Sequence, residues 1–210
     1  MSATPERSPE RDAALAALLA QSPFPGWSPA ALGAVLKAEG GFAEDAALLF
    51  PDGAAGMLEA FADLIDREMV ARAEAAGLET MRVSARVRAL IVARLAVLAP
   101  HKEAARRALA VLALPVNARV AARCAARTAD TTWHAAGDKA VDFSWYTKRA
   151  ILAGVITATL LYWLQDASED DVATLGFLDR RLAAVRRVGE MRQRLSGALA
   201  RLRPRFLREV

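Results

Sequence analysis

The chain has 210 residues, enough for one sizeable core or for one small and one larger domain, and its alanine- and leucine-rich composition, 54% hydrophobic, favours helices over strands. A single cysteine, Cys124, excludes an internal disulfide, and no cysteine–histidine cluster has the spacing of a zinc site. The net charge of +4 belongs to the C-terminus, because residues 180–210 contain ten arginines and two glutamates.

The first 52 residues contain a lead-in and three short helical segments. Residues 1–11 are polar and charged, and we expect them to be disordered. Residues 12–52 are predicted to form a helix-turn-helix-like unit, because prolines or glycines end each helical segment. Its three helices are expected at residues 12–21, 29–39 and 43–50.

Longer helical segments follow and are predicted to form one bundle over residues 53–192. Apolar side chains recur there at helical spacing, and no segment has convincing strand alternation, so the fold class is all-α with nine or ten helices. The uncharged run 150–165 has 16 residues, fewer than the roughly 20 of a membrane span, and predicts a buried helix. The helices of the bundle are expected at residues 52–76, 80–99, 101–114, 115–136, 142–165 and 168–192.

Three short helices followed by longer ones resemble the order in TetR-type regulators, which implies an N-terminal DNA-binding unit and a bundle for ligand binding and dimerisation. The segment that would be the recognition helix, residues 43–49, contains Glu44 and Asp45 and no basic or amide side chain. Residues 1–60 have three Lys or Arg residues against eight Asp or Glu. Because DNA phosphates would be repelled, we expect no specific DNA binding. A TetR-like transcriptional regulator with an apolar effector stays the alternative.

The C-terminal segment, residues 193–210, combines leucines at helical spacing with arginines. Such an amphipathic segment can insert its apolar stripe at a membrane surface while the arginines meet lipid phosphates. The alternative is that the leucines pack against the bundle or in a dimer, with the arginines in solvent. The membrane-binding candidates are Leu195, Leu199, Leu202, Arg194, Arg201 and Phe206.

The sequence offers little for catalysis. Its two histidines, His101 and His134, lie in no metalloprotease, nucleophile or phosphate-loop motif. Turns and helix caps explain Asp138, Asp142 and Asp166. We therefore expect no enzymatic activity, no cofactor and no metal site.

The most specific pattern lies between residues 133 and 181. It contains Trp133, the triplet Ala136-Gly137-Asp138, the block Trp145-Tyr146-Thr147-Lys148-Arg149, and Asp166 followed by Ser168. These features resemble the Coq nine family of ubiquinone-biosynthesis accessory proteins. The block at 145–149 is far more specific than helical periodicity, and the helical order is compatible from about residue 12.

The resemblance implies a TetR-like fold, a homodimer and a role without enzymatic activity. It also implies an internal pocket for an isoprenoid or quinone-type lipid, presentation of a quinone precursor to the pathway's di-iron hydroxylase, and a C-terminal helix that engages a membrane surface. The sequence has no organelle-targeting leader and a short tail. We therefore expect a bacterial, cytoplasmic member that associates peripherally with the inner membrane.

Two sets of candidate site residues follow from the resemblance. The family's partner-binding patch corresponds to Asp142, Trp145, Tyr146 and Arg149, a composition typical of an interface hot spot, with core packing of the two aromatic residues as the alternative. Lipid would contact apolar residues of the central helices, some of which must belong to the packed core. The lipid-binding candidates are Val87, Leu90, Ile91, Leu95, Ile151, Leu152, Val155, Leu160 and Leu161.

Overall fold

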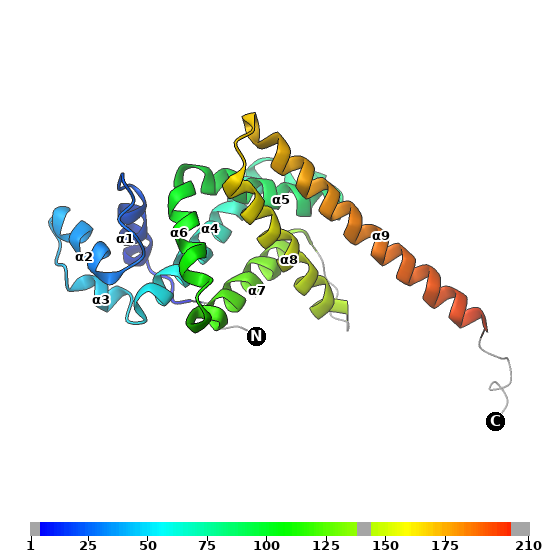
Figure 1. The fold of residues 1–210 in the computed structure, drawn as a ribbon, viewed down its shortest axis with the longest axis horizontal. Coiled ribbons are helices and arrows are strands. Elements are labelled where there is room, and N and C mark those ends of the chain that lie inside the picture. Colours follow the sequence, from blue (N-terminus) through cyan, green and yellow to red (C-terminus); the bar gives the residue numbers. More distant parts are fainter. Residues whose placement is uncertain (1–4, 138–143, 203–210) are drawn as a thin grey trace, which may run out of the picture.

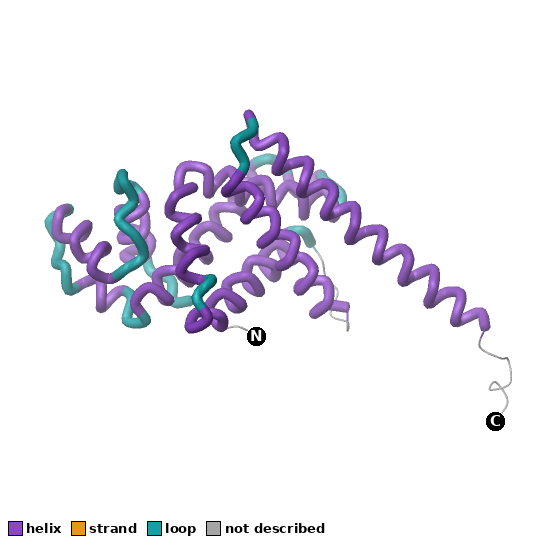
Figure 2. The backbone as a smooth tube through the Cα atoms, in the orientation of Figure 1, coloured by secondary structure: helices purple, strands orange, loops and turns teal. Residues whose placement is uncertain are grey.

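The computed structural model describes the backbone of residues 5–137 and 144–202 and the side chains of residues 5–137 and 147–187. Within these ranges all regular structure is helical, and short loops join the helices (Figure 2). The predicted all-α class is therefore confirmed. The α-helices are α1 (Pro9–Leu19), α2 (Pro29–Ala38), α3 (Asp45–Leu49), α4 (Gly53–Ala75), α5 (Val83–Leu98), α6 (Lys102–Leu112), α7 (Ala118–Ala135), α8 (Ser144–Gln165) and α9 (Val172–Leu202). The 3-10 turns are η1 (Leu78–Thr80), η2 (Ala99–His101), η3 (Pro115–Asn117) and η4 (Glu169–Asp171).

Helices α1, α2 and α3 lie together at one end of the molecule (Figure 1), and a serine–proline pair begins each of the first two. Ser8 and Ser28 each accept a hydrogen bond from the backbone N–H three residues later. The proline after each serine lies in the first turn, where an N–H has no intrahelical partner. Helix α1 consequently begins at Pro9, before the apolar pattern from which the sequence predicted it.

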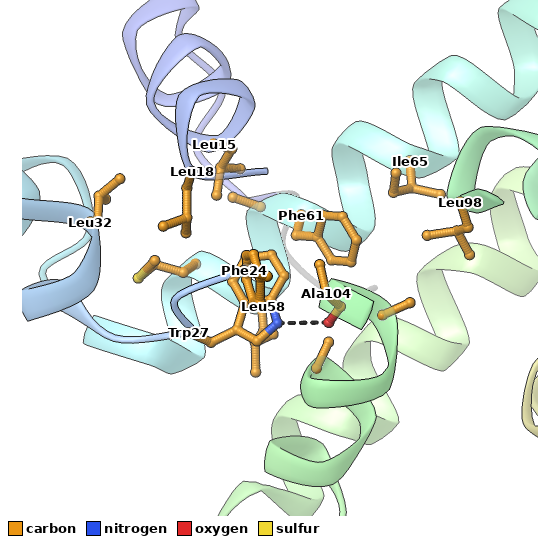
Figure 3. Close-up of a cluster of buried hydrophobic side chains, with 14 of the residues drawn as sticks. Leu15, Leu18, Phe24, Trp27, Leu32, Leu58, Phe61, Ile65, Leu98 and Ala104 are labelled. Atoms are coloured by element: carbon orange, nitrogen blue, oxygen red, sulfur yellow. Dashed lines mark hydrogen bonds between the residues drawn. The ribbon is translucent and has the colours of Figure 1, made fainter. Parts of the chain in front are cut away.

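Trp27 and α1 fix this three-helix unit to the bundle. The Trp27 ring packs on Phe61 of α4, with ring centroids 4.7 Å apart, and its Nε1 donates to the carbonyl oxygen of Ala104 in α6 at 2.9 Å (Figure 3). On α1, the carboxylate of Asp12 accepts a hydrogen bond from Arg67 of α4 at 2.7 Å. One core cluster therefore runs from the three-helix unit into the bundle.

The remaining helices pack around α4, which contacts both α5 and α7, while α8 packs on α7 and α9 packs on α8. A second core cluster of buried apolar side chains forms where α4, α5, α7, α8 and α9 meet. Its members include Met69, Leu90, Ile91, Ala129, Leu152 and Leu178. The buried apolar side chains of α4 and α5 are divided between the two clusters.

Helix α9 runs without interruption past residue 192, where the sequence predicted the bundle to end. It extends away from the other helices toward the C-terminus (Figure 1), so residues 193–202 continue a helix of the bundle. Among the helices that the structure describes, none combines the length and the apolar character that crossing a membrane requires.

Candidate functional site

An apolar cavity of about 450 Å³ lies between α6, α7 and α8, with side chains of α4 and α5 at its inner end. Eight of its twenty lining residues are alanines, most of them on α6 and α7. A methyl side chain fills little of the space between two helices, which explains why these helices enclose a cavity. Its volume falls within the range of pockets that bind small ligands.

The cavity is closed at one end and open at the other. The lining side chains of Phe61, Leu98 and Ala105 are buried and form the closed end. At the other end, Leu161 of α8 is 49% exposed and lines the cavity together with the exposed Thr157. Ala113 after α6 and Ala122 of α7 are also exposed lining residues, so the cavity opens between α8, α7 and the end of α6.

A polar group borders the closed end of this apolar space. Arg94 of α5 is 9% exposed and lines the cavity, and its Nη1 donates a hydrogen bond to Asp66 of α4, which is 3% exposed. Thr128 of α7 also lines the cavity and donates from its hydroxyl to the same carboxylate at 2.8 Å. Burial raises the pKa of Asp66, while Arg94 and Thr128 favour its charged form.

The ion pair between Arg94 and Asp66 does not use every N–H donor of the Arg94 guanidinium. Nε of Arg94 is buried and has no hydrogen-bond acceptor among the residues that the structure describes. A buried N–H without an acceptor is unfavourable.

The other chemistry at the cavity is weak. Burial raises the pKa of the Cys124 thiol, which therefore packs as a small neutral group, and its sulfur accepts a hydrogen bond from Arg127 at 3.7 Å. The lining contains neither a histidine nor a carboxylate, and no group of three or more His, Cys, Asp or Glu in the described ranges is placed to hold a metal ion. This geometry suits the binding of an apolar ligand better than acid–base chemistry.

The structure places the predicted lipid-binding residues in four different environments. Leu160 and Leu161 line the cavity. Leu95 packs in the core cluster that Trp27 joins, and Ile151 is exposed on α8. The remaining five are buried members of the second core cluster: Val87, Leu90, Ile91, Leu152 and Val155.

Sequence reasoning missed most of the residues that line the cavity. The available signal was alanine at helical spacing on two successive helices, as in Ala105 and Ala108 of α6 and Ala121 and Ala125 of α7. A second signal was Arg94, the one charged side chain on the stripe of α5 formed by Leu90, Ile91, Leu95 and Leu98.

The predicted partner-binding residues lie at or near the start of α8. Trp145 and Tyr146 are in its first turn, with side chains beyond those described, and Asp142 lies outside the described residues. Arg149 is mostly buried, with its side chain 13% exposed, and its Nε donates to Asp130 of α7 at 2.5 Å. This ion pair therefore joins the first turns of α8 to the C-terminal part of α7.

The predicted membrane-binding residues lie on the part of α9 that extends from the bundle. This holds for Leu195, Leu199, Leu202, Arg194 and Arg201, whose side chains are not among those described. Phe206 lies outside the described residues.

Comparison with known sequences finds similarity in the C-terminal half of the chain. Residues 118–189 match the family model of COQ9. Over 96 residues the chain is 42% identical to the ubiquinone biosynthesis protein COQ9, mitochondrial, of Rattus norvegicus, a match that covers 46% of this chain and 31% of that protein. The human protein of the same name is 40% identical over 96 residues, covering 46% of this chain and 30% of its own length.

A more distant relative gives a similar result. The protein named ubiquinone biosynthesis protein coq9, mitochondrial, of Schizosaccharomyces pombe is 31% identical over 84 residues, which cover 40% of this chain and 34% of that protein. The chain thus aligns with about a third of the length of the curated relatives it matches.

Among solved structures, the chain is similar to a TetR transcriptional regulator from Nitrosomonas europaea ATCC 19718. The TM-score is 0.67 at 22% sequence identity, over 84% of this chain and 98% of the regulator. At this identity the likeness concerns the fold alone, and it confirms the predicted TetR-like bundle. Residues 118–189, which contain α7, α8 and the first part of α9, are similar to the COQ9 family.

Proposed function

We propose that the chain is a non-enzymatic accessory protein of ubiquinone biosynthesis. It binds an isoprenoid lipid or quinone precursor in the apolar cavity and presents it to the di-iron hydroxylase of the pathway at a membrane surface. The observation that carries this proposal is the position of the cavity. Half of its twenty lining residues, on α7 and α8, lie in the segment that matches the COQ9 family.

The physical case for lipid binding rests on the composition of the cavity wall. An apolar chain that leaves water for such a wall gains roughly 25 cal/mol for each Å² of apolar surface buried. A long tail need not fit completely, because the mouth beside Leu161 allows it to continue outside. The cavity therefore suits a ligand with one compact end and an extended apolar end.

Access to such a lipid requires contact with a bilayer. The C-terminal part of α9 extends from the bundle and contains Leu195, Leu199 and Leu202 at helical spacing, flanked by arginines. We assign peripheral binding at the surface of the inner membrane to this segment and to Phe206 beyond it. The body of the protein would then lie in the cytoplasm.

Contact with the hydroxylase is assigned to the first turns of α8. The residues are Asp142, Trp145, Tyr146 and Arg149, and the ion pair of Arg149 with Asp130 supports a fixed orientation of this helix start on α7. Because α8 also lines the cavity, a partner bound at its start would lie on the same helix as the lipid.

A homodimer completes the proposal. Apolar side chains are exposed on the packed pair α8 and α9, among them Tyr162 and Val185. A second copy of the chain would cover them, and light scattering of the purified protein measures whether it does so.

For the N-terminal unit we propose a structural role. Helix α3 contains five residues, carries no basic side chain, and exposes Leu48. These features offer nothing to DNA phosphates or base edges. Specific retention of DNA by the protein in a gel shift at low salt would contradict this role and favour a transcriptional regulator.

The proposed function is tested by reconstituting the hydroxylase with its quinone precursor in liposomes, with and without this protein. The wild-type chain is expected to raise turnover. Ala125→Phe fills the cavity from α7 and should reduce that gain by about tenfold or more, since overpacked space excludes the ligand.

Ala126→Phe is the matched control, because Ala126 is exposed on the same helix and is not part of the cavity wall. It should leave the gain in turnover intact, with circular dichroism verifying that both variants are helical. An equal gain with Ala125→Phe, or no gain with the wild-type chain, would contradict the proposal.

A further inference from the structure

The connection between α6 and α7 exposes an unbroken apolar run. Residues 113–116 (the 113–116 loop) read Ala-Leu-Pro-Val, and all four are exposed. Leu114 is 51% exposed, and Val116 is 84% exposed, more than any other large apolar side chain in the described ranges. Single exposed apolar residues are ordinary, whereas a run of four without a polar neighbour indicates a contact surface.

The 113–116 loop is held in one conformation by its own hydrogen bonds. The N–H of Leu114 donates to the carbonyl oxygen of Val111 at 3.2 Å, and the N–H of Asn117 donates to that of Leu114 at 2.9 Å. The side-chain amide of Asn117 also donates to Val111, at 2.9 Å, and Pro115 has no N–H. These backbone donors need no water, which lowers the cost of moving the loop into apolar surroundings.

The 113–116 loop is continuous with the open end of the cavity. Ala113 is both the first residue of the loop and an exposed lining residue. Leu109 and Leu112 of α6 line the cavity just before the loop, and Ala122 of α7 lines it after the loop. A surface that covers the loop therefore also meets the mouth of the cavity.

Positive charge lies beside the 113–116 loop. Arg119, in the first turn of α7, is exposed and has no ion pair within the part of the chain that the structure describes. Arg123 follows about one turn later and pairs with Glu59 of α4, with Asp52 as a further carboxylate near it. Residues 102–127 contain six Lys or Arg and one Glu. The surroundings of the loop therefore favour an anionic partner.

A bilayer surface fits this loop better than a folded protein does. Four residues are few beside the roughly 20 to 30 on each side of a stable protein interface. Exposed leucine and valine can enter the acyl boundary of a bilayer while neighbouring arginines meet lipid phosphates. In Figure 1 the connection between α6 and α7 lies at the lower edge of the molecule, toward which the far end of α9 also extends, so one flat surface can touch both.

Resting on the proposed function, we infer that the 113–116 loop is a second membrane contact, in which Leu114 and Val116 insert into an anionic bilayer beside the mouth of the cavity. The far end of α9 alone would leave the orientation of the bundle on the membrane undefined. With two contacts the mouth lies against the bilayer, and an apolar chain passes between bilayer and cavity without crossing water.

Insertion is measured on the full-length protein with Val116→Cys labelled with the fluorophore NBD. On vesicles of phosphatidylcholine and phosphatidylglycerol, its emission should shift to the blue and be quenched by lipids that carry a nitroxide in the acyl chain. Ala47→Cys, at an exposed position of α3, is the matched control and should show neither change. The wild-type chain, whose single cysteine Cys124 is buried, gives the labelling background.

A second measurement is co-sedimentation with the same vesicles. Leu114→Glu combined with Val116→Glu should weaken it by about tenfold, since two carboxylates oppose both the apolar and the electrostatic attraction. Phe42→Glu combined with Leu48→Glu replaces two similarly exposed apolar side chains on the N-terminal unit and should bind nearly as tightly as wild type. Because all four side chains are exposed, circular dichroism should find both variants as helical as wild type.

The outcomes separate this contact from the proposed function. Vesicle binding by the wild-type chain without quenching of the label at Val116 would overturn the inference and leave a lipid carrier with α9 as its membrane contact. Equal losses in the two double-glutamate variants would also overturn it, because the effect would then be general charge repulsion. No binding of the wild-type chain to these vesicles would overturn the inference together with the membrane part of the proposed function.

Discussion

At the scale of single residues, Asp166 organises the connection between α8 and α9. Its carboxylate accepts hydrogen bonds from the backbone N–H groups of Ser168 and Thr174, both at 2.8 Å, and from the Thr174 hydroxyl. Nearby, Trp163 donates from Nε1 to Asp171 at 3.0 Å. Asp166 and Ser168, which carried part of the family resemblance, thus shape one turn between α8 and α9.

The hydrogen bonds at Asp166 predict a pH dependence of stability. The Thr174 hydroxyl, followed by Ser168, lowers the pKa of Asp166 below its ordinary value of about 4. A lowered pKa in the folded state means that this contribution to stability is complete above the unfolded pKa and is lost as the pH falls. Asp166→Asn should therefore lower the urea midpoint at pH 7, and its difference from wild type should narrow as the pH approaches 3.

Glu169→Gln is the control for this measurement, because it neutralises a carboxylate of the same turn that lies outside these hydrogen bonds. It should change the urea midpoint little at either pH. A difference between wild type and Asp166→Asn that stays constant from pH 7 to pH 3 would show that the carboxylate is not stabilised in the way described.

At the scale of helices, the sequence predicted where elements lie better than what they enclose. Apolar spacing identifies the buried face of α8, yet it cannot separate Leu160, which lines the cavity, from Leu152, which packs in the second core cluster. Both positions require an apolar side chain at the same period. The difference comes from the facing helices, where alanines leave space open, and that depends on how α6, α7 and α8 meet in three dimensions.

Arg94 shows what a local sequence pattern cannot predict. An arginine in an apolar stripe is visible in the sequence, but its partner Asp66 lies 28 positions away and is identified only when α4 and α5 are packed. The start of α2 was better determined, because the Ser28–Pro29 pair is a local signal for a helix N-terminus, whereas the same kind of signal at Ser8–Pro9 was overlooked and α1 was expected only from residue 12. Local capping chemistry is thus readable in advance, whereas buried pairs and cavities depend on tertiary packing.

The far end of α9 carries a prediction of its own. Leu195→Glu combined with Leu199→Glu places two carboxylates on the apolar stripe and should weaken co-sedimentation with anionic liposomes by about tenfold or more. Gln193→Glu combined with Ala200→Glu adds the same charge on the opposite side of the helix and should weaken it less. Equal losses in the two variants would indicate a purely electrostatic contact, and unchanged binding in both would remove this segment from the mechanism.

At the scale of the whole molecule, the two ends of the protein differ in charge. Residues 1–60 have an excess of carboxylates, and their helices α1, α2 and α3 form one end, while α9, with the arginines between residues 180 and 202, extends at the other. Between them the cavity opens beside α8, on the segment that matches the COQ9 family. This arrangement would hold the acidic end away from anionic lipid and bring the basic end toward it.

The central claim is that the cavity holds a lipid, and native mass spectrometry of protein purified from cells that synthesise ubiquinone tests it most directly. The wild-type protein and Ala126→Phe should each release an isoprenoid lipid on activation in the gas phase, and Ala125→Phe should release little or none. A wild-type protein that carries no lipid, or an Ala125→Phe variant that carries as much as wild type, would contradict the account.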